Sequence, residues 1–182
     1  MIRLVLAVTI MTLLSGCVTM TAPPREQNVV YTDTEATNIN PLLENSISIG
    51  EVSEFPGTSI ITLAGRLSPN LSNSTFTSYL NESLSNAGLL GEGYVLNAEL
   101  IESNDWSDWG HSLGKLNRNI EIEYTLIDQD NKVIFSEIII GNGEISNYNP
   151  LHPFYMLQRQ AAEKGYSDNI RQLIARLREV DI

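Results

Sequence analysis

The chain has 182 residues, of which 42% are hydrophobic and 18% charged, and its formal net charge is −11. This length accommodates one ordinary domain with a core of its own. Affinity for nucleic acid comes largely from cations that neutralise phosphates, so we expect this acidic chain neither to bind nucleic acid nor to be drawn electrostatically to anionic lipid.

The first sixteen residues have the pattern of a secretory signal peptide. Arg3 precedes a mostly apolar run, Leu4 to Leu14, which is shorter than the roughly 20 residues that span a bilayer. The run ends in Leu14-Ser15-Gly16-Cys17, which resembles the bacterial lipobox, in which the cysteine thiol receives diacylglycerol and the signal is cleaved just before it. A plain secretory signal with a chance cysteine is the alternative. Cys17 is the only cysteine, and lipidation accounts for it.

Lipidation predicts that Cys17 is the mature N-terminus and the membrane anchor. Lipoproteins of this kind carry two or three acyl chains, which makes the anchor effectively permanent. Val18 follows the cysteine, whereas an aspartate at this position commonly holds lipoproteins of Gram-negative cells in the inner membrane. We therefore expect the protein at the periplasmic face of the outer membrane.

The rest of the chain divides into a tether and a domain. Residues 18–41 are rich in Thr, Asn, Pro and Glu and sustain no apolar period, so 17–41 are expected to be the lipidated cysteine followed by a flexible tether. Residues 42–182 are expected to form a single α+β periplasmic domain.

Within the domain, a first strand is expected over 46–52, and residues 58–72 are ambiguous. A helix is expected from about 73 to 87, because Phe76, Leu80, Leu84 and Ala87 form an apolar stripe. Gly88 is expected to end that helix.

Strands are expected at 94–100, 119–127 and 132–140, with a turn at 128–131. Alternation buries Tyr124 and Leu126 and exposes Glu123. Gly141 and Gly143 are expected to loosen the chain, and a final helix is expected from about 153 to 179, with Gly165 as a weak point that kinks or divides it. The order β-α-β-β-β-α predicts a two-layer α+β sandwich, an antiparallel sheet with two helices on one face.

Several core and turn motifs resemble a group of small proteobacterial lipoproteins. They are Ala87-Gly88-Leu89-Leu90, Tyr94-x-Leu96-x-Ala98-x-Leu100, Ile122-x-Tyr124-x-Leu126-Ile127-Asp128, Val133, Ala161-Ala162-Glu163 and Asn169-Ile170. The layout is also similar to envelope lipoproteins that assist assembly and transport machines, such as the lipopolysaccharide-assembly lipoprotein LptE and the auxiliary lipoproteins of ABC-type lipid transporters. The resemblance covers roughly 45–180 and implies a fold without implying a catalytic residue.

Motifs of enzymes and metal sites are weak. Ser112-Leu113-Gly114-Lys115 and Ser167-Asp168-Asn169 match the S-x-x-K and S-D-N of penicillin-binding enzymes, but no K-T-G follows. His111 and His152 lack the spacing and partners of a zinc site, and Asp128 and Asp130 suit a hairpin turn better than a calcium loop. We expect no catalytic residue, metal or cofactor.

Both tryptophans lie in one long polar segment between two predicted strands. Ser, Asn, Asp and Gly surround Trp106 and Trp109, and no period places the two rings in the core. The rings either fold back on the sheet edge or contact a partner. We predict that segment 103–117 presents Trp106 and Trp109 to a protein or glycan surface.

These features indicate a lipid-anchored envelope protein and leave two roles open. The first is a non-enzymatic accessory or structural subunit of a cell-envelope complex, with an envelope protein as partner. The second is a periplasmic carrier or chaperone that holds a lipid-like or glycan ligand between sheet and helices. An envelope hydrolase is the weakest alternative.

Overall fold

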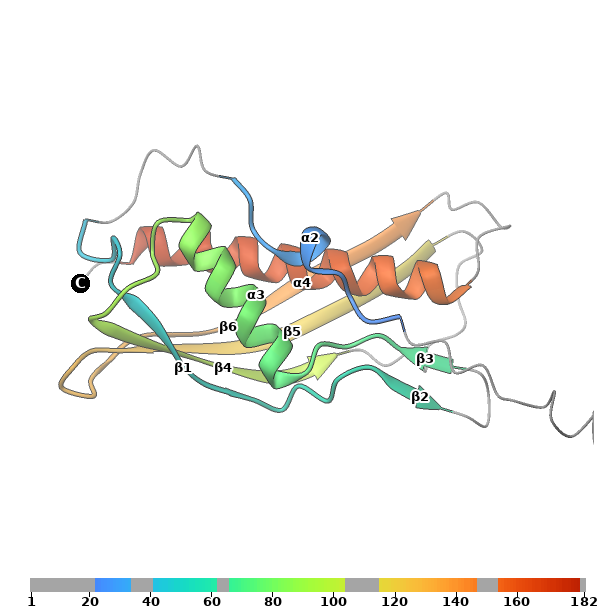
Figure 1. Ribbon diagram of the computed structural model, residues 1–182, viewed down its shortest axis with the longest axis horizontal. Helices are drawn as coiled ribbons and strands as arrows, with labels where there is room; N and C mark the ends of the chain where they lie inside the picture. Colours follow the sequence, from blue (N-terminus) through green and yellow to red (C-terminus); the bar gives the residue numbers. More distant parts are fainter. Residues whose placement is uncertain (1–21, 34–40, 62–65, 104–114, 147–153, 181–182) are drawn as a thin grey trace, which may run out of the picture.

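The computed structural model describes residues 22–33, 41–61, 66–103, 115–146 and 154–180 (Figure 1). In chain order the elements are α2 (Glu26–Val29), β1 (Ile47–Ser53), β2 (Ser59–Ile61), β3 (Arg66–Ser68), α3 (Asn73–Asn86), β4 (Tyr94–Ser103), β5 (Lys115–Ile127), β6 (Val133–Ser146) and α4 (Phe154–Glu179). The expected main order β-α-β-β-β-α is confirmed, and β2 and β3 form a small additional antiparallel pair in the region left ambiguous.

The main sheet has the strand order β1-β4-β5-β6 and is mixed. β4, β5 and β6 pair antiparallel, as expected, but β1 pairs parallel to β4, with Ile47 opposite Tyr94. The prediction of a purely antiparallel sheet was therefore wrong. The physical reason is the long connection through α3, which returns the chain to the other end of the sheet so that β4 can run parallel to β1, whereas a short hairpin would make neighbouring strands antiparallel.

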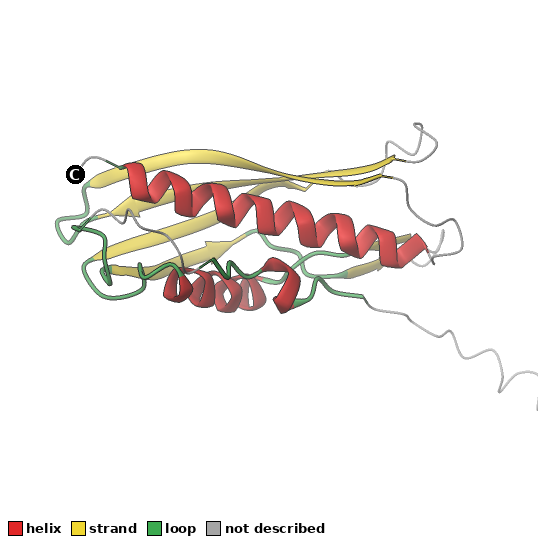
Figure 2. Cartoon of the chain, turned by 90° about the horizontal axis from the view of Figure 1, so that it is seen from above, coloured by secondary structure: helices red, strands yellow, loops and turns green. Residues whose placement is uncertain are grey.

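Both long helices cover one side of the sheet, as Figure 2 shows. Tyr124 and Leu126 of β5 are fully buried beneath them, whereas Glu123 lies on the opposite face and is partly exposed, which agrees with the expected register. The largest buried side chains of this interface include Phe76 and Tyr166, whose ring centroids lie 6.1 Å apart. The expected two-layer packing is thus present, with aromatic and aliphatic side chains between the layers.

Local signals fix the ends of α3. The hydroxyl of Ser72 accepts a hydrogen bond from Thr75 N at 3.2 Å, so Ser72 is the N-cap. Gly88 has a φ of 72° and follows the helix as predicted. The buried residues of α3 include Phe76, Leu80 and Leu84, the three largest members of the expected stripe.

Glycines allow α4 to approach β6 closely. A Cβ on Gly143 would lie 1.9 Å from the carbonyl oxygen of Ala161, and one on Gly141 would lie 2.1 Å from that of Gly165. Gly141 and Gly143 therefore lie inside a long strand and do not loosen the chain. Gly165 does not divide α4, which is one helix from Phe154 to Glu179.

The segment expected to be a flexible tether contains a structured part. Residues 22–33, here called the strap, include the short helix α2 and lie across α3 and α4 (Figure 1). Ala22, Val29, Val30 and Tyr31 are buried. Burial of these apolar side chains offsets the entropy that is lost when the segment becomes ordered. The segment is polar on average, so its composition does not reveal this ordering. The cleavage and lipidation positions, 16 and 17, lie outside the described residues.

Candidate functional site: the strap and the open face of the sheet

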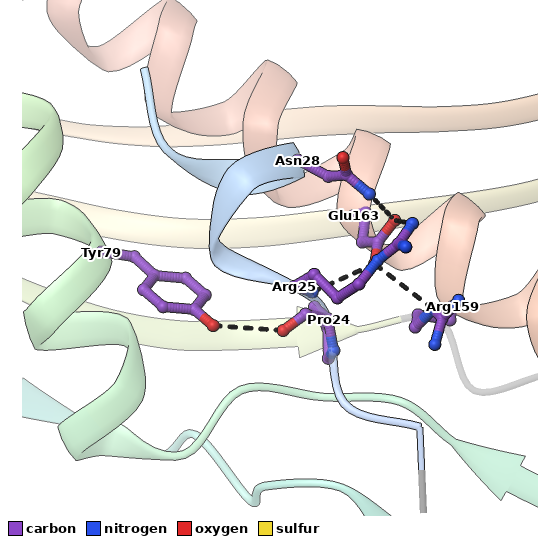
Figure 3. Close-up of polar contacts among 6 residues, drawn as sticks. All are labelled: Pro24, Arg25, Asn28, Tyr79, Arg159 and Glu163. Carbon is purple, nitrogen blue, oxygen red and sulfur yellow. Dashed lines mark hydrogen bonds and ion pairs between the residues drawn. The ribbon is translucent and has the colours of Figure 1, made fainter. Parts of the chain in front are cut away.

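Glu163 of α4 holds the beginning of the strap (Figure 3). Its carboxylate accepts hydrogen bonds from Arg25 N and Arg25 Nε, both at 3.0 Å, and from the Asn28 amide nitrogen at 2.5 Å. Arg159, one helical turn earlier, adds an ion pair at 3.4 Å. The Glu163 side chain is only 3% exposed. A carboxylate so buried needs such charged and polar partners, and two of its three partner residues come from the strap.

The strap is also bound to α3. The hydroxyl of Tyr79 donates to the carbonyl oxygen of Pro24 at 3.2 Å (Figure 3). Further along, Tyr31 N donates to the hydroxyl of Ser83 at 3.1 Å, and the Asn86 amide donates to the Tyr31 carbonyl at 2.9 Å. The strap therefore satisfies several of its backbone groups on side chains of α3 and α4, as a structural element of the domain does.

The other side of the sheet carries no helix among the described elements, and we call it the open face. Its two central strands bring four glutamates together in two facing pairs: Glu99 opposite Glu123, and Glu102 opposite Glu121. Like charges directly opposite each other on antiparallel strands destabilise the pair. The open face therefore has an electrostatic cost that is removed when cations approach it.

Isoleucines lie beside these glutamates. On β6, Ile138 is opposite Glu123 and Ile140 is opposite Glu121. Ile138 is 56% exposed and Ile140 is 42% exposed. Next to Glu123 is a shallow hollow of about 290 Å³, lined by Glu51, Ser53, Asn97, Ala98, Glu99, Glu123 and Thr125. The open face thus combines acidic and apolar side chains on a rigid sheet.

Helix α4 shields part of the edge of this sheet. Gln172 donates to the carbonyl oxygen of Ile140 at 2.9 Å, Asp168 accepts from Asn142 N at 2.8 Å, and Lys164 donates to the carbonyl oxygen of Glu144 at 3.0 Å. Ile140, Asn142 and Glu144 are alternate residues of β6, and their backbone groups point away from β5. With its edge groups occupied, this half of β6 is closed to strand addition by another chain.

The structure places some of the residues singled out in the sequence and leaves others outside its described part. Ser167, Asp168 and Asn169 lie within α4, where the Asn169 side chain is fully buried and bonds to Tyr124, Ile120 and Ile139. Asp128 accepts from Asp130 N and Lys132 N, both at 2.9 Å, which confirms the hairpin turn. Trp106, Trp109, His111, Ser112 and His152 lie outside the described residues.

Two absences apply to the part of the chain that the structure describes. None of its helices is both long and apolar enough to cross a bilayer. Nor does it contain a group of three or more His, Cys, Asp or Glu side chains arranged to hold a metal ion.

Sequence reasoning missed both the strap and the composition of the open face. The signal for the strap is the apolar run Val29-Val30-Tyr31 within an otherwise polar segment. The signal for the open face is Glu121 and Glu123 in a strand whose neighbour, β6, has three consecutive isoleucines at 138–140. Side chains alternate along a strand, so Ile138 and Ile140 share one face and Ile139 lies on the other, and the pairing with β5 places Ile138 and Ile140 with the glutamates.

No family model and no curated protein matches this chain. Solved structures with a similar arrangement include a proposed lipoprotein from Caulobacter crescentus, with 11% identity, a TM-score of 0.48, and coverage of 74% of this chain and 89% of that one. A minor lipoprotein from Acinetobacter baumannii has 9% identity and a TM-score of 0.49, over 76% and 94% of the two chains. A protein from Chlamydia trachomatis has 11% identity and a TM-score of 0.49, over 75% and 97%.

Two of these three structures are described as lipoproteins, and none is described as a lipopolysaccharide-assembly or ABC-transport component. Similarity at this level concerns the arrangement of elements and transfers no activity.

Proposed function

We propose that this protein is a lipid-anchored lipoprotein of the outer membrane, facing the periplasm, that acts as a non-enzymatic accessory or structural subunit of a cell-envelope complex. The anchor is supported by the lipobox-like Leu14-Ser15-Gly16-Cys17 after a short apolar run. The role is supported by one observation, the exposed Ile138 and Ile140 beside the paired glutamates of the open face. Exposed apolar side chains gathered on a rigid surface are typical of protein contacts.

The chemistry of the open face indicates what its partner carries. Glu121 and Glu123 each have a glutamate on one side and an isoleucine on the other. Lysines or arginines from a partner would relieve the repulsion between the paired carboxylates, and apolar side chains would cover the isoleucines. The fitting partner is thus a protein surface with both basic and apolar residues.

The carrier role receives less support. It requires space between sheet and helices, and that layer is filled by fully buried side chains such as Phe76, Tyr124 and Tyr166. A lipid-like ligand there would have to displace a close-packed core. The described hollow lies instead on the open face and is lined mostly by polar residues. We therefore favour the accessory role.

Photo-crosslinking in cells tests the role. A photoreactive amino acid is placed at Ile138 or Ile140 on the open face and, as a matched control, at exposed Ser85 of α3. We expect the same defined crosslinked protein from both isoleucine positions and none from Ser85, and loss of that product in an Ile140→Arg variant when the probe is at Ile138. Equal products from all three positions would contradict the assignment of the open face.

The anchor has a separate test, the variant Cys17→Ser. Without the thiol that accepts the lipid, the precursor should accumulate uncleaved or be processed without membrane anchoring. Globomycin, which blocks lipoprotein signal cleavage, should cause the same accumulation in the unaltered protein. A mature-length Cys17→Ser protein that still fractionates with the outer membrane would refute lipidation.

A further inference from the structure

The strap runs alongside α4 in the same direction as the helix. Arg25 bonds to Glu163 near the beginning of α4, and Tyr31 lies beside Arg178 near its end, with the guanidinium carbon 5.7 Å from the ring centroid. The two helix positions are about 22 Å apart along the helix axis. Traced backwards, the strap therefore leads toward the N-terminal end of α4, and the ribbon of the strap begins on that side (Figure 1).

Only a short stretch of chain separates the strap from Cys17. Ala22 is buried, with 5% of its surface exposed, and Cys17 precedes it by five positions. Five residues span at most about 18 Å, however they are arranged. An undocked tether from residue 17 to residue 41 would reach about 80 Å. Docking of the strap therefore removes most of the reach that the sequence alone allows.

We infer that the strap fixes the domain directly above the membrane, standing on the end where α4 begins and β6 ends. This inference rests on the proposed lipid anchor at Cys17. The partner surface is the lipid bilayer that holds the anchor. In this arrangement the β5–β6 turn is farthest from the bilayer, because it lies at the other end of a strand of 14 residues, about 45 Å long.

The distribution of charge favours this orientation over one in which the domain lies on its side. The open face carries its paired glutamates, so it is repelled by anionic head groups. Standing upright keeps this acidic face clear of the bilayer and accessible to a protein partner.

Energy transfer to a labelled membrane tests the orientation. The full lipidated protein is placed in vesicles of phosphatidylethanolamine and phosphatidylglycerol that contain an acceptor-labelled lipid. The sole native cysteine is blocked by its lipid, so one added cysteine takes the donor dye: Ser146→Cys at the end of β6, or Gln129→Cys in the distal turn. Both native residues are exposed. We expect efficient transfer from position 146 and a large loss of transfer from position 129.

Two insertions distinguish a docked strap from a plain tether. About 20 flexible Gly/Ser residues are inserted either before the strap, between Val18 and Ala22, or after it, within 34–40. A docked strap predicts that the first insertion lowers transfer from position 146 and that the second leaves it unchanged. A plain tether predicts that both insertions act alike, which would overturn the inference.

The outcomes separate the inference from the proposed function. If the protein does not float with the vesicles at all, the lipid anchor fails. If it floats but positions 146 and 129 transfer equally, the anchor is retained and the upright orientation is overturned.

Discussion

Tyr124 and Asn169 join the sheet to α4 through a buried hydrogen bond. The Tyr124 hydroxyl donates to the Asn169 side-chain oxygen at 2.7 Å, and both residues are fully buried. The Asn169 amide in turn donates to the carbonyl oxygens of Ile120 and Ile139, at 3.0 and 2.7 Å. One asparagine thus links the helix to two neighbouring strands. Such a fully satisfied polar network specifies how the layers meet.

We predict that stability falls steeply at alkaline pH because of the buried tyrosines. Burial raises the pKa of Tyr124 well above the ordinary 10.0 and the pKa of Tyr166 to about 12. Both phenols remain protonated in the folded chain while the unfolded chain ionises, so their contribution is fully present below pH 10 and is lost as pH rises toward 12 and beyond. Urea unfolding between pH 8 and about 11.5 measures it.

The variant Tyr124→Phe is the matched control for this pH dependence. It should flatten the alkaline decline, and it should cost about 1–3 kcal/mol at neutral pH because the Asn169 oxygen loses its partner. An alkaline decline of unchanged slope would show that other groups control it.

The sheet register predicts a strong asymmetry between neighbouring residues of β5. Leu126→Ala should destabilise the domain by about 2–5 kcal/mol, because the side chain is fully buried beneath the helices. Glu123→Gln should be neutral or stabilise by up to about 1 kcal/mol, because it removes one charge of the pair with Glu99. Chemical denaturation measures both. Equal losses of stability would contradict the assignment of the two faces.

Some of this architecture could be predicted from the sequence, because the spacing of apolar residues repeats with the period of a helix or of a strand. The stripe of Phe76, Leu80 and Leu84 predicts α3, and alternation around Tyr124 predicts which face of β5 is buried. The direction of β1 is not encoded in alternation, since parallel and antiparallel strands have the same period of two. It is decided by the α3 crossover.

The strap and the glycines of β6 could not be predicted for a different reason. Val29, Val30 and Tyr31 are too few to establish a period, and their burial depends on contact with α3 and α4, elements that come later in the chain. Gly141 and Gly143 usually weaken a strand, and only the approach of α4 shows why they stand there. In both cases the structure depends on contacts between segments that are distant in the sequence, and such contacts leave no local pattern.

We predict that Glu163 controls release of the strap. Glu163→Gln retains the shape of the side chain but removes the charge that bonds to Arg25 and Asn28, so it should increase amide hydrogen exchange over residues 25–31 and leave β5 protected. Glu137→Gln is the matched control, because the ion pair of Glu137 with Arg176 joins side chains that are 46% and 55% exposed and should contribute little. Faster exchange throughout the domain in Glu163→Gln would show a general loss of stability.

The prediction for Trp106 and Trp109 concerns residues outside those described, and it remains as the sequence states it. If the two rings contact a partner, replacing both with alanine should leave the melting temperature of the domain nearly unchanged and weaken association with envelope proteins, measured by crosslinking in cells.

The segment that carries Trp106 and Trp109 joins the end of β4 to the beginning of β5, and the beginning of β5 is paired with the last residues of β6. In the proposed orientation that end faces the bilayer. Brominated lipids therefore give a second measurement: quenching of tryptophan fluorescence in vesicles would assign the rings to the membrane, whereas unquenched emission with lost crosslinks would assign them to a protein. A melting temperature lowered by many degrees would instead place the rings in the core.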